Sequence, residues 1–380
     1  MSKWPGKTVI GLTGNIGTGK SVVRRMLEHL GAYGIDADQL SHRAIAKGGP
    51  AYQQVLDVFG KFILSSDGEI DRSRLARVVF NNPEALATLE AIVHPMVEQA
   101  VDHLIRRSTQ SVIVIEAIKL LESSLHKSCD SIWTVFASPD VQIARLVLNR
   151  GITEHDARQR ISSQSSQEAK IAAANVVIKN SQSYEDTWNQ VVTAWKKYVK
   201  AEERSTGPLA TGEKTQKGDI TIHRGGPRHC QEIADLINRF SASSTRLTSD
   251  DIMAAFGEKA FLILKSGETA IGVIGWQVEN LVSRTTDIVL DPSVPVEKTL
   301  PIMIQEMEKA SRDLQSEAAL LFLHPELVQH EKIWHDLGYE PRPAESLGVL
   351  AWQEAAIESM TPGVQLFFKQ LRIDRVLHPI

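Results

Sequence analysis

The feature that most constrains this chain is a glycine-rich loop near its N-terminus. The loop consists of Gly14, Asn15, Ile16, Gly17, Thr18, Gly19, Lys20 and Ser21. An apolar run expected to be a strand, Thr8–Thr13, precedes it, and a helical pattern, Ser21–Leu30, follows it. Glycines let the backbone curl until successive N–H groups face one anion beside a helix N-terminus. The pattern G-x-x-x-x-G-K-[ST] in this context predicts a nucleoside triphosphate site. An ordinary glycine-rich turn is the alternative.

The residue types in this loop also indicate what individual side chains would bind. Lys20 would reach the β- and γ-phosphates of ATP, and the Ser21 hydroxyl would ligate Mg²⁺. We therefore expect Gly14–Ser21 to bind the nucleotide, with Lys20 also catalytic and Ser21 a metal ligand.

Two carboxylates follow the second expected strand, in the segment Ile35-Asp36-Ala37-Asp38. In an open parallel sheet, ligands bind at the carboxyl edge of the strands, which is where these carboxylates would lie. A carboxylate there can accept the proton of an attacking hydroxyl and help to hold Mg²⁺. The chain contains no N-K-x-D guanine motif. The pair therefore favours a kinase over a GTPase, although two solvated carboxylates capping the next helix are an alternative.

The first 200 residues alternate strands and helices. The apolar strand runs are continuous, which indicates burial on both faces and a parallel, doubly wound α/β sheet. The expected strands are Thr8–Thr13, Tyr33–Asp36, Val112–Ile115, Ile132–Phe136 and Val176–Ile178. Residues 49–107 carry helical periodicity and predict a helical cap inserted between the second and third strands. Residues 145–170 are rich in Arg and Gln and are expected to be exposed and mobile.

Length and composition predict two domains of ordinary size in 380 residues. Residues 201–218 read as a flexible linker between a domain at 1–200 and one at 219–380. The net charge of −4 divides into +4 for residues 1–200 and −8 for the remainder, which argues against a nucleic-acid partner. The longest apolar run, Ala318–Leu323, is too short for a membrane span. Two cysteines and the lack of a signal-peptide core favour the cytoplasm.

Residues 7–199 resemble the dephospho-CoA kinase family. The resemblance rests on an ordered set of motifs: Gly11–Ser21, Asp36–Asp38, Gly49-Pro50, Phe59-Gly60, Gly68–Arg72 and Leu89–Pro95. It implies a P-loop kinase fold with a helical cap and lid. It also implies ATP- and Mg²⁺-dependent phosphorylation of the ribose 3′-hydroxyl of dephospho-CoA, giving CoA and ADP in the last step of coenzyme A biosynthesis.

The resemblance assigns further residues to the site. Asp38 matches the general base and Asp36 supports metal or geometry, both beside the substrate. His94 is expected near dephospho-CoA, although it is equally well read as a structural histidine before Pro95. Arg145 lies in the family's lid pattern, in which Arg150 is our choice for the catalytic lid arginine. Arg160 and Gln164 complete that pattern as substrate-binding residues.

The chain departs from the family pattern in three segments. Asn15 replaces a glycine, with little expected effect on phosphate binding. After the third expected strand, Ile118 stands where the family has proline and Lys119 where it has leucine. Lys119 would add a positive charge for a phosphate of the substrate, or is simply exposed, and the preceding Glu116 could act on Mg²⁺ through water. Asn175 replaces an aspartate and Gln182 a glycine, which puts adenine contacts in doubt, while Asn180 remains as a nucleotide-binding residue. An active enzyme is still expected.

The second half reads as an α+β domain with the order β-α-α-β-β-β-α-β-α, which resembles the Gcn5-related N-acetyltransferase fold. Active members carry [RQ]-x-x-G-x-[GA] at the start of the central helix. Here the position reads Leu290-Asp-Pro-Ser-Val-Pro-Val-Glu-Lys298, without glycine. Because no cradle of N–H groups is left for a diphosphate, we expect a non-catalytic domain. Oligomerisation, regulation by an acyl-CoA or peptide, and solubility are its possible roles.

Two alternatives to a dephospho-CoA kinase stay open. A P-loop kinase of another nucleotide-like acceptor predicts an arginine clamp in residues 49–107, where the sequence has only the scattered Arg72, Arg74 and Arg77. A sensor of CoA or nucleotide with vestigial catalysis predicts ATP binding that does not depend on Asp38. The sequence leaves the oligomeric state open.

Overall fold

The first half of the chain forms a five-stranded sheet that is parallel throughout. The computed structural model describes residues 3–80, 82–199, 220–240 and 246–373, so the expected linker at 201–218 lies outside the described residues. The sheet has the order β2-β3-β1-β4-β5, with every neighbouring pair parallel. Its strands are β1 (Thr8–Thr13), β2 (Tyr33–Asp36), β3 (Val112–Glu116), β4 (Ser131–Phe136) and β5 (Val176–Lys179). The predicted doubly wound α/β sheet is therefore confirmed.

Helices cover both faces of this sheet. Helices α1 (Lys20–His29) and α9 (Tyr184–Tyr198) pack on one face, and α2 (Ala37–Ile45) and α5 (Pro83–Arg107) pack on the other. Side chains of β3 point alternately to the two cores, Val112 and Val114 to the first and Ile113 and Ile115 to the second. Burial on both faces explains why the strands are apolar without alternation.

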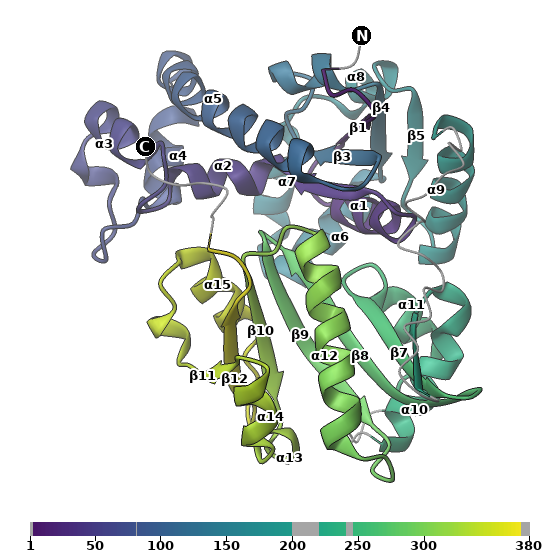
Figure 1. The fold of residues 1–380 in the computed structure, drawn as a ribbon. Helices are drawn as coiled ribbons and strands as arrows, with labels where there is room; N and C mark the ends of the chain where they lie inside the picture. The colour runs from purple at the N-terminus through teal and green to yellow at the C-terminus, as the bar shows by residue number, and fades with distance from the viewer. Residues whose placement is uncertain (1–2, 81, 200–219, 241–245, 374–380) are drawn as a thin grey trace.

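Both inserted segments are helical, which the sequence predicted for the first of them. Between β2 and β3 lie α3 (Tyr52–Phe59), the short turn η1 (Lys61–Ile63) and α4 (Arg72–Phe80), and α5 connects them to the sheet (Figure 1). Between β4 and β5 lie α6 (Pro139–Arg150), α7 (Glu154–Ser162) and α8 (Gln167–Ala172). Of these, α8 has a buried lysine, so the segment is less exposed than expected.

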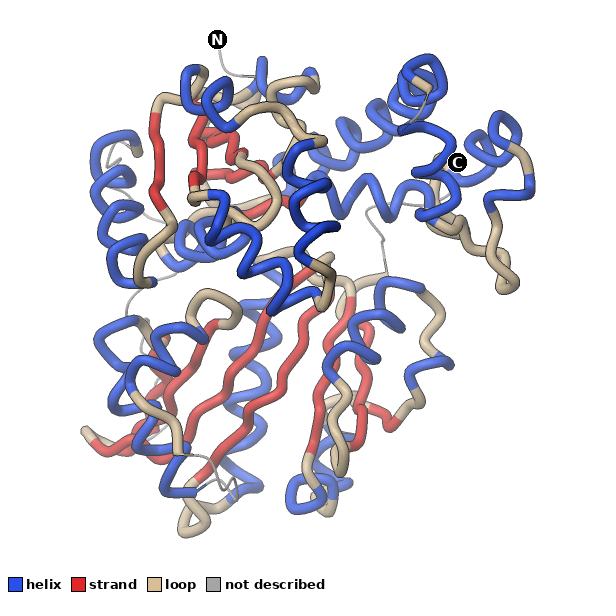
Figure 2. Tube along the Cα trace, turned by 180° about the vertical axis from the view of Figure 1, so that it is seen from behind, coloured by secondary structure: helices blue, strands red, loops and turns tan. Residues whose placement is uncertain are grey.

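The second half forms a seven-stranded mixed sheet with the order β11-β12-β10-β9-β8-β7-β6. Its strands are β6 (Ile220–Arg224), β7 (Ala260–Ser266), β8 (Thr269–Glu279), β9 (Val282–Leu290), β10 (Ala318–Leu323), β11 (Glu340–Pro341) and β12 (Gln365–Gln370). All pairs are antiparallel except β9 with β10. The strands of the two sheets lie in separate halves of the molecule (Figure 2).

The helices of this half confirm the expected α+β order and extend it. The expected elements are α10 (Cys230–Phe240), α11 (Ser249–Ala255), α12 (Val296–Asp313) and α14 (Glu331–Asp336). In this half the sequence analysis missed α13 (Pro325–Val328), the short turns η3 (Pro227–His229) and η4 (Ala344–Ser346), helix α15 (Leu350–Ser359), and the strands β11 and β12; in the first half it missed the short turn η2 (Ser124–Ser128). Strand β12 inserts between β10 and β11, so the chain after α15 folds back onto the domain.

The two halves share a packed boundary. The tip of the β8–β9 hairpin, Asn280–Leu281, has both residues at positive φ. Leu281, together with Leu314 after α12, packs against the core of the first half. Arg43 of α2 donates to the Glu317 carboxylate at 2.7 Å, and these side chains are 6% and 0% exposed. No helix among the described residues has the length and apolarity needed to cross a membrane.

Candidate functional site

The loop between β1 and α1 forms a cup because three glycines hold conformations that other residues rarely adopt. Gly14, Gly17 and Gly19 have φ values of 149°, 75° and 85°. A Cβ atom at Gly14 would overlap the Val135 carbonyl oxygen, and one at Gly19 would overlap the Asn180 side chain. The backbone is therefore free to present N–H groups at the N-terminus of α1, which has no side-chain cap of its own.

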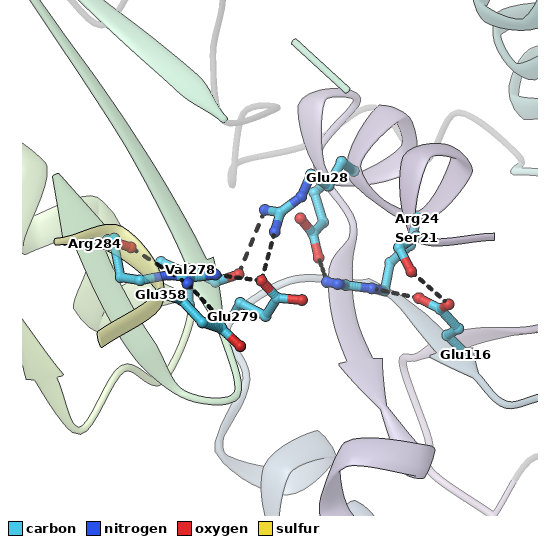
Figure 3. A network of polar contacts seen from close by, with 10 residues as sticks. Ser21, Arg24, Glu28, Glu116, Val278, Glu279, Arg284 and Glu358 are labelled. Atoms are coloured by element: carbon cyan, nitrogen blue, oxygen red, sulfur yellow. Dashed lines mark hydrogen bonds and ion pairs between the residues drawn. The ribbon is translucent and has the colours of Figure 1, made fainter. Parts of the chain in front are cut away.

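The first residues of α1 place a lysine and a hydroxyl at this cup. Lys20 is buried, whereas Ser21 is exposed. The Ser21 hydroxyl donates to Glu116 Oε1 at 2.9 Å, and Arg24 Nε donates to Glu116 Oε2 at 2.8 Å (Figure 3). Because the Ser21 proton points at Glu116, the lone pairs of its oxygen are free for another partner.

The two aspartates after β2 have different environments. Asp36 is the N-cap of α2 and accepts from the Gln39 N–H at 2.9 Å. Burial, and then the nearby Glu116 charge, raise the pKa of Asp36 to about 7. Asp38 instead accepts from the Ile118 N–H at 3.0 Å. Burial raises the pKa of Asp38, while the Lys20 ammonium acts in the opposite direction. The helix-capping alternative therefore describes Asp36, whereas Asp38 faces the lysine of the cup.

The lid segment contacts the outside of the cup through two of its side chains. Gln164 Oε1 accepts from the Ile16 N–H at 2.8 Å. Arg145 donates to the carbonyl oxygens of Gly17 and Thr18 at 3.3 and 3.4 Å.

Of the two other lid arginines that the sequence predicts for the site, the structure describes the side chain of one. Arg160 is exposed on α7. Arg150 is the last residue of α6, and its side chain lies outside the described part of the structure. Arg145, which the sequence analysis placed in the lid without choosing it, is thus the lid arginine whose contacts with the loop the structure describes.

The other predicted residues differ in how close they come to the cup. Asn180 is buried and donates to the Thr18 carbonyl oxygen at 2.8 Å, so it braces the loop from behind. Lys119 is exposed and pairs with Glu90 of α5 at 3.1 Å. That contact corresponds to the exposed alternative for Lys119 rather than to a phosphate ligand. His94 is half-buried in the middle of α5, one residue before a proline inside that helix.

Two of the three scattered arginines of the helical insertion have partners that do not form a clamp. Arg72 pairs with Glu354 of the second half at 3.0 Å. Arg74 pairs with Asp71 at 3.1 Å. These contacts give no support to the monophosphate clamp expected of a kinase for another acceptor.

The sequence analysis missed two residues of this site. Arg24, the partner of Glu116, is 4% exposed although it lies in a helix whose pattern gave no reason to single it out. Lys170 is 1% exposed and donates to the Ile118 carbonyl oxygen at 2.8 Å. A single lysine in a polar segment carries no sign of burial, so only the fold identifies it.

The donor set at the cup fits Mg²⁺ bound with a nucleotide. Mg²⁺ prefers oxygen ligands, takes one or two from protein carboxylates or hydroxyls, and takes the rest from phosphates and water. The Ser21 hydroxyl and the Glu116 carboxylate are in contact at the carboxyl edge of the sheet. Among the described residues, no group of three or more His, Cys, Asp or Glu side chains could hold a metal by itself. A metal here would therefore need the phosphates as ligands.

Comparisons with known proteins place the first half in one family. A family model described as dephospho-CoA kinase matches residues 8–186. A dephospho-CoA kinase of Carboxydothermus hydrogenoformans is 41% identical over 193 residues, which cover 50% of this chain and 94% of that protein. One of Geobacter metallireducens is 41% identical over 199 residues, which cover 52% of this chain and 99% of that protein.

Among solved structures, an N-acetyltransferase of Thermoplasma acidophilum in complex with coenzyme A covers 40% of this chain and 99% of its own, with 11% identity and a TM-score of 0.32.

Proposed function

The chain belongs to the dephospho-CoA kinase family, whose members phosphorylate dephospho-CoA to CoA, and we propose that it does so with ATP and Mg²⁺ at the cup of residues 14–21. The observation that carries the assignment of residues is the placement of Asp38. Its carboxylate interacts with the Lys20 ammonium and is held by the Ile118 N–H. A base beside the phosphate-binding lysine is what transfer to an alcohol requires.

The loop would bind and orient the triphosphate. Its N–H groups and the α1 N-terminus favour anionic oxygens, and Lys20 adds a full positive charge. Ser21 would hold Mg²⁺ directly and Glu116 would hold it through water. When bound, the metal neutralises charge on the β- and γ-phosphates. Arg145 reaches the loop from the lid and would add positive charge there.

Asp38 would accept the proton of the ribose 3′-hydroxyl. Its pKa is raised by burial, which makes the carboxylate a better base near neutral pH than an exposed aspartate. The helices between β2 and β3 would bind the rest of dephospho-CoA, with His94 on α5 as the expected contact. The two cysteines of the chain are free thiols, which agrees with the proposed cytoplasmic location.

The first prediction tests this assignment. ADP release is measured with ATP and dephospho-CoA for the wild type and for Asp38→Asn. We expect a fall in kcat of about 10²- to 10⁴-fold from loss of the base, with ATP affinity by calorimetry within about twofold. The control is Asp235→Asn, an exposed aspartate of the second half.

Other outcomes separate the alternatives. Wild-type ATP binding without turnover on dephospho-CoA would indicate a sensor. Faster turnover with another nucleotide-like acceptor would indicate a different kinase. Unchanged kcat in Asp38→Asn would remove Asp38 from the mechanism.

We further propose that the second half is an acetyltransferase-like domain that does not catalyse acetyl transfer and that stabilises the folded kinase half, a role we call the brace. Helix α12 follows β9 through residues 291–295, which contain no glycine, and has Pro295 as its N-cap and Glu297 in its first turn. An acidic first turn opposes a diphosphate. The same domain contacts α1, where Arg25 donates to the Val278 carbonyl oxygen at 3.4 Å and lies 4.0 Å from Glu279 (Figure 3).

The second prediction tests the brace. Glu317→Ala leaves the Arg43 guanidinium buried without its carboxylate, which typically costs about 3–5 kcal/mol. We expect a loss of that size in the free energy of unfolding, and a matching drop in the temperature at which kinase activity is lost. Glu354→Ala is the matched control, because its ion pair with Arg72 also joins the two halves but is 44–49% exposed; it should cost less than about 1 kcal/mol. Kinase activity as heat-resistant in Glu317→Ala as in the wild type would refute the brace.

A further inference from the structure

Two lysines are buried among the residues that the structure describes, and the proposed mechanism uses one of them. Lys20, at 8% exposed, belongs to the phosphate cup. Lys170, at 1% exposed, lies on α8 and has no role so far. Burying an ammonium group is unfavourable unless the surroundings compensate for the lost water. The burial of Lys170 therefore calls for an explanation.

Lys170 is held at both its ends. Its backbone carbonyl oxygen accepts from the Thr134 hydroxyl at 3.0 Å, which fixes α8 to β4. Its ammonium donates to the Ile118 carbonyl oxygen at 2.8 Å, and the Thr13 hydroxyl donates to the same oxygen at 3.1 Å. The ammonium is thus bound to a carbonyl of the segment that follows β3.

Two of the three charges that act on Lys170 belong to the proposed active site. Burial lowers its pKa, and so does the Lys20 ammonium, while Glu122 and Asp38 act in the opposite direction. Ile118, whose carbonyl binds Lys170, uses its own N–H to bind Asp38. Two hydrogen bonds therefore connect Lys170 to the proposed base through one residue.

Ile118 is also a position at which this chain departs from the family pattern, which has proline there. A proline has no N–H and could not donate to Asp38. In this chain the segment after β3 can hold Asp38 by a hydrogen bond, and the position of that segment is maintained by Lys170.

We propose that Lys170 is a positioning residue for phosphoryl transfer. Its ammonium holds the Ile118 carbonyl so that the Ile118 N–H keeps the Asp38 carboxylate beside the cup. Its charge adds to that of Lys20 on the side of the site where the phosphoryl group is transferred. The inference rests on the proposed kinase function. In the proposed arrangement Lys170 contacts neither ATP nor dephospho-CoA.

The test compares Lys170→Met, Lys170→Gln and Lys170→Arg in the full chain, after wild-type turnover with dephospho-CoA has been established. A small displacement of a reacting group costs up to about 10²-fold in rate, so we expect Lys170→Met to lower kcat about 10- to 100-fold. ATP affinity by calorimetry should stay within about twofold. Lys170→Arg, which keeps charge and donors, should recover most of the loss. Lys127→Met, at an exposed lysine, is the control.

A double-mutant cycle with Ile118→Pro shows whether Lys170 acts through the Ile118 N–H. If it does, Lys170→Met costs less in the Ile118→Pro background than in the wild type. Additive effects, or a wild-type kcat in Lys170→Met, would overturn the inference while leaving the kinase assignment intact. Loss of ATP affinity with kcat unchanged would overturn it too, because Lys170 would then bind nucleotide. Should Lys170→Met not fold, Lys170→Gln takes its place, because Gln has no positive charge and a side chain one bond shorter than that of Lys; a kcat equal to that of Lys170→Arg would then overturn the inference. Absence of wild-type turnover is a failure of the proposed function itself.

Discussion

Each half of this protein contains a strand that leads through a short loop into a helix, and the two junctions have opposite chemistry. Between β1 and α1, three glycines at positive φ open the backbone, and Lys20 begins the helix. Between β9 and α12, prolines stand in place of glycines, and Glu297 lies in the first helical turn. Both helices lack a side-chain N-cap.

The comparison shows that a free helix N-terminus is insufficient to make a phosphate site. The loop before the helix must bring further N–H groups to the same point, and the first turn must carry net positive charge. Lys20 supplies that charge at α1, whereas Glu297 offsets Lys298 at α12. Only the first junction has these properties. The difference in phosphate binding between the two junctions can be tested by mutation and by ligand binding.

The largest effect is expected for Lys20→Ala. Loss of a preorganised cation at the transferring phosphoryl group should lower kcat/KM about 10³-fold and weaken ATP binding. Lys298→Ala is the matched control, because Lys298 is an exposed lysine in the first turn of α12; the same assay should show no change. Equal losses in the two variants would mean that both junctions serve the kinase.

An intermediate effect is expected on thermal stability when a phosphate-containing ligand is added for each junction. ATP at about 100 times its Kd should stabilise the chain by about 2.7 kcal/mol, measured by thermal unfolding. Acetyl-CoA should produce no shift in a Lys20→Ala chain, in which the first junction is impaired. A clear acetyl-CoA shift in that variant would show that the second junction binds a diphosphate after all.

The smallest effect is expected at the far end of α1, where His29 Nε2 lies 3.1 Å from the Phe256 carbonyl oxygen of the second half. Burial lowers the pKa of His29 to about 3. Since the unfolded value is about 6.5, stability due to neutral His29 is complete above that pH and is lost as pH falls towards 3. At pH 5 the loss is about 2 kcal/mol.

The measurement is the free energy of unfolding between pH 8 and 5 for the wild type and His29→Gln. Gln keeps a donor for Phe256 but does not titrate in this range. The raised pKa of Asp36 makes its contribution to the free energy of unfolding increase as pH falls, which is opposite to the effect of His29. This contribution is the same in both proteins and therefore cancels in their difference. Parallel curves would contradict the assignment of the slope to His29.

The outcome of the sequence analysis differed between local and distant features. The β1–loop–α1 unit and the bounds of β2 could be predicted because each depends on a few consecutive residues. The helical insertion at residues 49–107 followed from its periodicity. The strand β12 was missed, because its place between β10 and β11 depends on pairing with residues about 50 positions earlier in the chain.

The candidate site shows the same division at the level of side chains. Its residue types and its place at the carboxyl edge of the sheet follow from motifs. Two contacts of the site depend on how the helices are oriented relative to one another. They are the contact of Arg145 with the loop and the ion pair between Lys119 and Glu90. The sequence alone led us to choose Arg150, whose side chain lies outside the described part of the structure.

By itself, the sequence determined a glycine loop of the phosphate-binding type and predicted that its lysine and two aspartates serve a phosphotransferase, since backbone freedom and charge are properties of the residues themselves. Only the tertiary structure decided that Asp36 caps a helix while Asp38 faces Lys20, that Lys170 is buried beside them, and that Glu317 meets Arg43 across 274 positions. The physical reason is that burial and hydrogen bonding depend on distances in space, which the order of residues along the chain does not specify.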